Sequence, residues 1–244
     1  MAASSRIKGY WERVGYLGRP YRILPGVYIL GGPEITDPDD CCVYLVEAKG
    51  EVAVIDAGLG LSAGVLLRNL LSFGLHPEQV KYLIATHGHA DHAGGLAELQ
   101  SSTGAPVVAH RLELPFLEGG DLTLTAALLY GVGFQPVQVA KVMEEDSLEL
   151  PLGDKKLYLL HTPGHTPGSI SLYLEAEGQR VLFAQDVHGP FRPEWGSDRA
   201  AWRRSVELLK SLEADVLCEG HFGVFRPADR VERYLYRCLL SHRD

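Results

Sequence analysis

Residues 86–92 read Thr-His-Gly-His-Ala-Asp-His, and this stretch decides how the rest of the chain is interpreted. Three imidazoles and one carboxylate follow directly after a short apolar run. Imidazole nitrogen and carboxylate oxygen are ligands suited to zinc, iron or manganese. The i, i+2 spacing of His87 and His89 places both side chains on one side of an extended turn, and Asp91 and His92 follow as a helix begins. One loop can therefore offer two ligands to one metal and two to a neighbour.

Three more ligand-type residues stand at the ends of predicted strands. His165 lies in the tight turn Thr-Pro-Gly-His-Thr-Pro-Gly of residues 162–168, where proline and glycine can hold an imidazole rigidly. Asp186 follows an apolar strand, and His221 follows the strand 215–219. Each could be an ordinary turn residue by itself. Their shared placement at strand exits predicts that they converge on one edge of a sheet.

The chain alternates short apolar runs with turn residues and amphipathic stretches, which indicates two sheet-forming halves flanked by helices. Such halves are typical of a layered α/β sandwich, and the lack of any linker or repeat favours one domain over residues 1–244. The predicted strands are 21–30, 42–47, 51–56, 81–86, 106–109, 157–161, 169–175, 180–185 and 215–219. The predicted helices are 61–73 with Gly74 as C-cap, about ten residues from His92, 197–212 with Ser197 or Asp198 as N-cap, 227–240, and a mostly helical insert at about 110–146.

Composition excludes several classes of protein. With 244 residues, 46% hydrophobic and 22% charged, the chain is neither disordered nor membrane-spanning, since no long uncharged apolar stretch occurs. The start MAASSRIKGYWERVG lacks the apolar core of a secretory signal. The four cysteines form no CxxC pair, which favours reduced thiols. A net charge of −8 argues against nucleic-acid and membrane partners. We therefore expect a cytoplasmic protein with a small-molecule substrate, and a homodimer is left open.

The motifs THGHADH and TPGHTPGS, the later Asp186, and Gly-His before a final helix resemble the metallo-β-lactamase-fold hydrolase superfamily. The resemblance extends from about Tyr21 to the end of the chain, and its forms are closest to glyoxalase II-like and lactonase-like hydrolases. It implies an αββα sandwich with a dinuclear metal site at one edge. It also implies that Asp56 orients the ligand loop by hydrogen bonds, although an ordinary Asp-Ala-Gly turn is the alternative.

The resemblance further implies two divalent ions, with zinc expected and iron or manganese as alternatives. The ligands that it implies are His87, His89 and His165 for the first ion, Asp91, His92 and His221 for the second, and Asp186 as a bridge between them.

Two such ions, roughly 3.5–4 Å apart, can share a water and lower its pKa to near 7. The resulting hydroxide would cleave a small ester, thioester, lactone or amide bond. Asp91 is placed to hydrogen-bond the nucleophile or to pass a proton to the leaving group. His188 could donate a proton or support a ligand, and a plain turn histidine is an equal alternative.

Three other functions compete with hydrolysis of an ester-like bond. A mononuclear iron persulfide dioxygenase needs only a three-residue ligand set, but the segment after Asp186 reads Val-His-Gly-Pro-Phe-Arg and lacks the Gly-Cys-Gly-Arg-Thr-Asp segment typical of that branch. A metal-dependent phosphodiesterase or nuclease would call for a basic groove, which the sequence does not clearly contain. A degenerate binding protein is disfavoured because all seven ligand positions are filled.

Specificity is expected to come from the loop after Asp186 and from the insert, which should form an apolar roof over the pocket. Of these residues, Tyr130, Phe134 and His188 are predicted to line the pocket beside the metals. The apolar candidates in the insert are Phe116, Leu117, Leu128, Leu129, Tyr130 and Phe134, and for any one of them simple core packing is the alternative.

Overall fold

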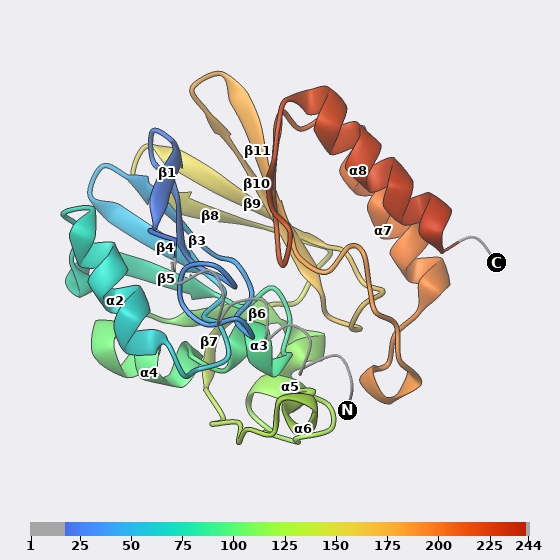
Figure 1. Ribbon diagram of the computed structural model, residues 1–244, viewed down its shortest axis with the longest axis horizontal. Coiled ribbons are helices and arrows are strands. Elements are labelled where there is room, and N and C mark those ends of the chain that lie inside the picture. The colour runs from blue at the N-terminus through green and yellow to red at the C-terminus, as the bar shows by residue number, and fades with distance from the viewer. Residues whose placement is uncertain (1–17, 243–244) are drawn as a thin grey trace.

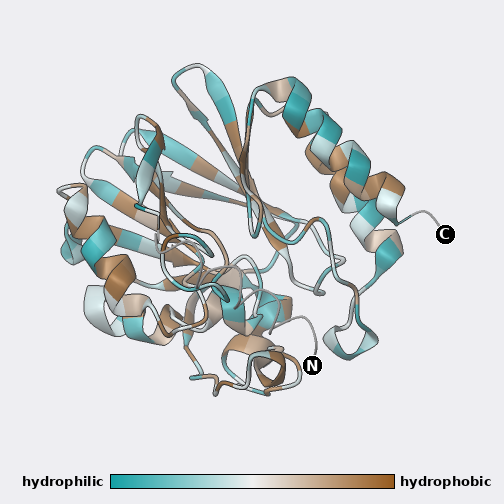
Figure 2. Cartoon of the chain, viewed as in Figure 1, coloured by the Kyte–Doolittle hydropathy of each residue, from teal (hydrophilic) through white to brown (hydrophobic). Residues whose placement is uncertain are grey.

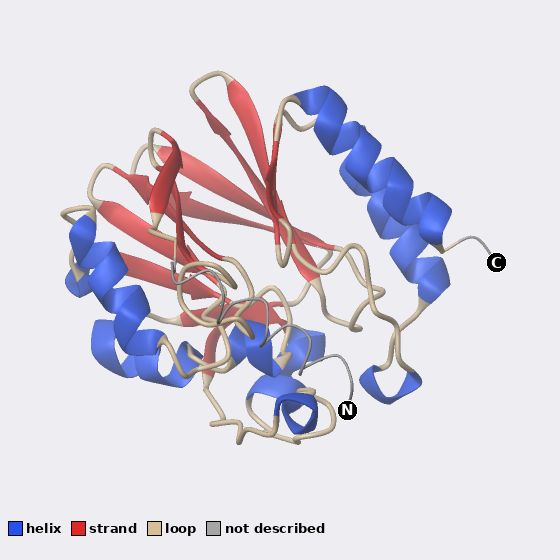
Figure 3. Ribbon diagram, in the orientation of Figure 1, coloured by secondary structure: helices blue, strands red, loops and turns tan. Residues whose placement is uncertain are grey.

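The structure is a computed structural model that describes residues 18–242, so the prediction about an N-terminal signal lies outside the described residues. Two β-sheets face each other, and helices cover the outer face of each sheet (Figures 1 and 3). The first sheet contains β1 (Tyr21–Leu24), β2 (Val27–Gly31), β3 (Val43–Ala48), β4 (Glu51–Ile55), β5 (Val80–Ile84), β6 (Val107–His110) and β7 (Val139–Met143). The second contains β8 (Ser147–Leu152), β9 (Lys155–His161), β10 (Ile170–Ala176), β11 (Gln179–Ala184), β12 (Val216–Glu219) and β13 (Gly223–Phe225).

The α-helices vary in length, and several are single turns. The α-helices are α2 (Ala63–Ser72), α3 (Ala90–Ala93), α4 (Leu96–Thr103), α5 (Leu114–Leu117), α6 (Ala127–Tyr130), α7 (Arg199–Ser211) and α8 (Ala228–Ser241). Short 3₁₀ turns lie at Pro77–Gln79, Arg111–Glu113 and Pro193–Trp195. No helix among the described residues is both long and apolar enough to cross a membrane.

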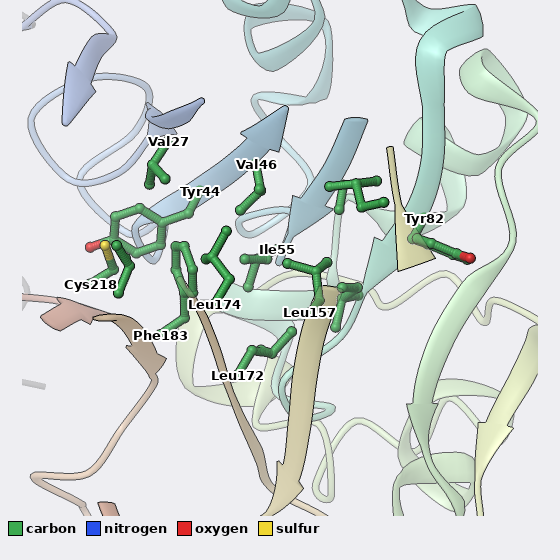
Figure 4. Close-up of a cluster of buried hydrophobic side chains, with 14 of the residues drawn as sticks. Val27, Tyr44, Val46, Ile55, Tyr82, Leu157, Leu172, Leu174, Phe183 and Cys218 are labelled. Atoms are coloured by element: carbon green, nitrogen blue, oxygen red, sulfur yellow. The ribbon is translucent and has the colours of Figure 1, made fainter. Parts of the chain in front are cut away.

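Side-chain alternation explains the layering. In β3, Tyr44 and Val46 belong to the cluster between the two sheets, whereas Val43 and Leu45 belong to the cluster beneath α2 and α4. Because successive side chains of a strand point to opposite faces, a strand buried on both faces must be apolar throughout. Figure 4 shows Tyr44 opposite Phe183 of the second sheet within the central cluster.

The outer helices are amphipathic, which fixes them on the sheets. In α7 and α8, Trp202, Val206, Leu209, Val231 and Leu235 are buried against the second sheet. Many of their remaining positions are charged, so both helices carry hydrophilic and hydrophobic residues side by side (Figure 2). These layers confirm the predicted αββα sandwich.

Most predicted strands and helices are confirmed within a few residues. Asp198 rather than Ser197 caps α7, since its Oδ1 accepts the N–H groups of Ala200 and Ala201 at 2.8 and 3.0 Å. The single helix predicted from His92 is wrong: it is two helices, α3 and α4, separated by two glycines. A side chain at Gly94 would overlap the backbone oxygen of Leu59.

The prediction that residues 110–146 are mostly helical is wrong in part. The segment contains a 3₁₀ turn and the one-turn helices α5 and α6, and its last part is β7, which pairs in parallel with β6. Glycine follows each helix after one turn: Gly119 and Gly120 come soon after α5, and Gly131 is the left-handed C-cap of α6. The run Val-Ala-Lys-Val-Met is typical of an edge strand, because its apolar side chains alternate with less buried ones.

Candidate metal centre

Asp56 ties the histidine-rich loop to the edge of the first sheet. β4 and β5 are parallel neighbours, so Asp56 and Thr86 leave the sheet side by side. Asp56 Oδ1 accepts the Thr86 N–H at 2.8 Å, and Oδ2 accepts the Thr86 hydroxyl at 2.8 Å. His92 Nδ1 donates to Asp56 Oδ2 at 2.9 Å, which leaves His92 Nε2 free to face the centre. Asp56 therefore makes the orienting hydrogen bonds expected of it, from a backbone with an uncommon φ of +62°.

The first cluster of donor atoms joins loops from both sheets. His165 Nε2 lies 2.8 Å from His89 Nδ1, and His87 Nε2 lies 3.1 Å from the same atom. The Asp186 Oδ2 atom is 3.2 Å from His165 Nε2 and 4.0 Å from His87 Nε2. One ligand atom from each of these four buried residues falls within 4.8 Å of the others, so they could hold a single ion.

The second cluster lies on the other side of the same carboxylate. His92 Nε2 and His221 Nε2 are 3.3 Å apart, and Asp91 Oδ2 is 3.7 and 3.5 Å from them. Asp186 Oδ1 lies 3.3 Å from His92 Nε2 and 3.1 Å from His221 Nε2. Asp186 thus turns one oxygen to each cluster, which is the arrangement of a bridging ligand. The strand exits do converge at one edge, near α3 in Figure 1.

The chemistry of the first cluster fits a divalent cation. Burial lowers the pKa values of His87, His89 and His165, which keeps these imidazoles neutral and their lone pairs available. Burial alone would raise the pKa of Asp186, but neighbouring imidazoles, His221 first, hold it well below its usual range. Asp186 Oδ1 is buried and faces the Nε2 atoms of His92 and His221, but makes no well-aligned hydrogen bond among the described residues. A buried anionic oxygen of this kind calls for a cation.

Glu113 is a functional residue that the sequence analysis missed. It is fully buried, and it joins the two loops that carry the first cluster. Its Oε2 accepts the Gly88 N–H at 2.7 Å, while Oε1 accepts the Gly168 N–H at 2.8 Å and the Thr166 hydroxyl at 2.6 Å. Burial raises the pKa of Glu113 to about 7, against the effect of these hydrogen bonds. The only signal in the sequence was one carboxylate inside an apolar run.

Glu219 plays the corresponding part at the second cluster. Its Oε2 accepts the N–H groups of His221 and Phe222 at 2.7 and 2.9 Å, which fixes the loop that carries His221. Its Oε1 accepts a hydrogen bond from His188 Nδ1 at 2.9 Å. The His188 ring lies 5.6 Å from the His221 ring, so His188 stands beside the second cluster. His188 belongs to neither cluster of donor atoms. The contacts of Glu219 could not be predicted from the sequence, because this residue simply ends an apolar strand.

The structure places the predicted pocket residues in different surroundings. Tyr130 is half-buried, and burial followed by the nearby Asp91 carboxylate raises the pKa of its hydroxyl, so it lies beside the second cluster. Phe134 is buried among the apolar side chains beneath the first sheet, where it packs as core. Trp195, which the sequence analysis did not single out, is buried with its ring 4.3 Å from the His89 ring.

Comparison with known proteins gives consistent matches. A model of the metallo-beta-lactamase superfamily matches residues 36–221. The "Probable metallo-hydrolase YflN" of Bacillus subtilis is 29% identical over 217 residues, covering 73% of this chain and 79% of the relative. The acyl-coenzyme A thioesterase MBLAC2 of Homo sapiens is 27% identical over 236 residues, covering 82% and 81%. The solved structure of BJP-1, a subclass B3 metallo-beta-lactamase of Bradyrhizobium japonicum, has a TM-score of 0.72 at 26% identity and covers 86% of this chain and 80% of its own.

Proposed function

The chain belongs to the metallo-β-lactamase superfamily of metal-dependent hydrolases, and we propose that it holds two divalent ions and cleaves a thioester or a related small ester or lactone. The orientation of Asp186 carries this proposal. Its Oδ2 faces His165 and its Oδ1 faces His221, at 3.2 and 3.1 Å. A carboxylate buried between two sets of imidazoles has the geometry to share its charge between two cations. Zinc is the ion that we expect, with iron or manganese as alternatives, because histidine and aspartate suit all three.

When bound, a pair of divalent ions would acidify a water near neutral pH and polarise the carbonyl of the substrate. The protein's own part is to hold the seven side chains in place. Asp56, Glu113 and Glu219 do this by hydrogen-bonding ligand rings or the backbone next to them. Such supporting contacts typically affect metal affinity or activity by about 10–100-fold.

Asp91 and His188 are the residues that we propose for proton transfer. Asp91 Oδ2 lies at the inner side of the second cluster, 3.5 Å from His221 Nε2, where it could accept a proton from the attacking water. His188 is oriented by Glu219 through Nδ1, so Nε2 is the nitrogen that would donate to a leaving group. This pairing of a buried carboxylate with a half-exposed imidazole favours the proton-donor interpretation of His188 over that of a plain turn residue.

A thioester is the favoured bond because one of the similar proteins is an acyl-coenzyme A thioesterase whose match covers 82% of this chain. Thiolate is a leaving group that needs little help from a proton donor, whereas an alkoxide from an ester or lactone needs more. The dependence of rate on His188 should therefore separate the two classes of substrate: its replacement should slow ester cleavage more than thioester cleavage.

The experiment is elemental analysis of the purified protein together with assays on thioesters, aryl esters, lactones and phosphodiesters. We expect two ions per chain and cleavage of at least one carbonyl substrate. Asp186→Ala should lower the occupancy of both sites and nearly abolish turnover, whereas Asp154→Asn, an exposed carboxylate that lies 4.0 Å from Lys49, serves as the matched control. Full metal content and rate in Asp186→Ala would refute the bridging assignment.

A further inference from the structure

A cavity of about 610 Å³ opens beside the second cluster of donor atoms. His221 forms part of its wall, so the cavity borders the candidate metal centre at this residue. The other residues that line it come from the segment before β1, from β1 and β2, from the loop that follows β2, and from the turn after His221. They are Gly18, Arg19, Tyr21, Ile29, Gly32, Pro33, Glu34, Ile35, Cys42, Phe222 and Gly223.

The walls of this cavity are mostly apolar. Ile29 and Ile35 are buried at 3% and 9% exposure, while Tyr21 and Phe222 are aromatic residues that remain 47% and 61% exposed. A half-exposed aromatic pair beside a hollow leaves apolar surface in water, and a ligand that covers it would remove that surface from water.

A second hollow, of about 360 Å³ between α7 and α8, offers a contrast. Its lining combines the charged residues Lys210, Glu213, Asp229 and Glu232 with apolar residues of α7 and α8, and includes no candidate ligand of a metal. Of these two hollows, only the cavity beside His221 contacts a candidate metal ligand. A cavity of several hundred cubic ångströms is of the size that typically holds a small organic ligand.

We propose that the cavity beside His221 binds the hydrocarbon part of the substrate's acyl group. This inference rests on the proposed function, because it places the scissile carbonyl at the metal centre. With the carbonyl there, one arm of the substrate can pass His221 and lie between Ile35 and Phe222. A linear acyl chain matches the apolar part of the wall, formed by Ile29, Ile35, Tyr21 and Phe222, while Arg19 and Glu34 are the charged residues of its lining.

The test measures binding as well as turnover. Saturated n-alkyl carboxylates from four to twelve carbons are titrated by calorimetry into the metal-loaded protein and into protein treated with chelator. We expect the dissociation constant to fall about fourfold for each added methylene until the cavity is filled. Ile35→Trp, which fills the cavity, and Phe222→Ala, which removes one wall, should both flatten this series. Leu71→Trp, at an exposed apolar position of α2, is the matched control and should leave the series unchanged.

The outcomes separate this inference from the proposed function. A steep series that both cavity variants flatten supports the inference, even if the loaded protein hydrolyses no thioester. An equal affinity for all chain lengths, or a steep series that neither variant changes, overturns it, even if thioesters are hydrolysed. Should Ile35→Trp fail to fold, Phe222→Ala decides, because its side chain is exposed and outside the core.

Discussion

Replacing Glu113 with glutamine should weaken metal binding by about 10–100-fold while changing the stability of the fold much less. The carboxylate accepts three hydrogen bonds, from Gly88, Thr166 and Gly168, and these positions neighbour His87, His89 and His165. In Glu113→Gln one acceptor oxygen becomes an NH₂ group that faces a backbone or hydroxyl donor. One of the two ligand loops is then released from the other.

Two terms of similar size act on stability at pH 8. Losing a buried hydrogen bond to a charged acceptor costs about 1–3 kcal/mol. Burial raises the pKa of Glu113 to about 7, compared with about 4.3 in an unfolded chain. Ionising the wild-type residue in the folded state therefore costs about 3–4 kcal/mol at high pH, and glutamine removes that cost. The two terms offset each other in part, so the unfolding free energy should change by no more than about 3 kcal/mol.

The same pKa sets the sign of a pH dependence. A carboxyl whose pKa is raised on folding binds more protons in the folded state between about pH 4.3 and 7, so its contribution to stability is present at low pH and is lost as pH rises. The difference in unfolding free energy, wild type minus Glu113→Gln, should therefore fall by about 3–4 kcal/mol from pH 4.5 to pH 8. A flat difference would show that Glu113 is not buried as an acid of raised pKa.

The assay is competition with a chromophoric chelator for metal affinity, combined with urea unfolding of the metal-free protein. Glu118→Gln is the matched control, because Glu118 also accepts a backbone N–H, from Val139 at 3.0 Å, but contacts neither ligand loop. Wild-type metal affinity in Glu113→Gln, or an equal loss in Glu118→Gln, would refute the role given to Glu113.

Three further outcomes are expected. Asp56→Ala should destabilise the fold by about 3 kcal/mol or more, as judged by urea unfolding, and should reduce occupancy of the second metal, because three buried donors lose their acceptor; an unchanged second site would contradict this. His188→Ala should lower kcat more than it raises KM on ester substrates in steady-state kinetics, and equal effects on both constants would remove it from proton transfer. Gly94→Ala should destabilise the protein by about 1–3 kcal/mol in the same unfolding assay, since the added methyl would overlap the Leu59 backbone oxygen; wild-type stability would mean that the backbone moves aside.

The sequence could predict the sandwich and the convergence of the candidate ligands, because both depend on local signals. Apolar runs identify strands, and residues such as Asp56 and Asp186 stand at strand exits, where topology brings them to one edge. The motif around His87 also carries its own spacing, which does not depend on the rest of the fold.

Other features could not be predicted because they depend on contacts between distant segments. Glu113 meets Gly168 across 55 positions of the chain, and its apolar sequence neighbours alone do not reveal that contact. Trp195 packs beside His89 for the same kind of reason. The strand β7 was not predicted, because the glycines and prolines of its segment suggested interrupted helices. Its pairing with β6 is what identifies it as a strand. Phe134 could not be assigned to the core or to the pocket from its neighbours in sequence.

The most direct test of the central claim is the anomalous scattering of crystals grown with zinc, recorded above and below the zinc absorption edge. Two peaks are predicted, about 3.5–4 Å apart, one on each side of Asp186. His87, His89 and His165 should surround one peak, and Asp91, His92 and His221 the other. A single peak, or two peaks without Asp186 between them, would contradict the dinuclear site.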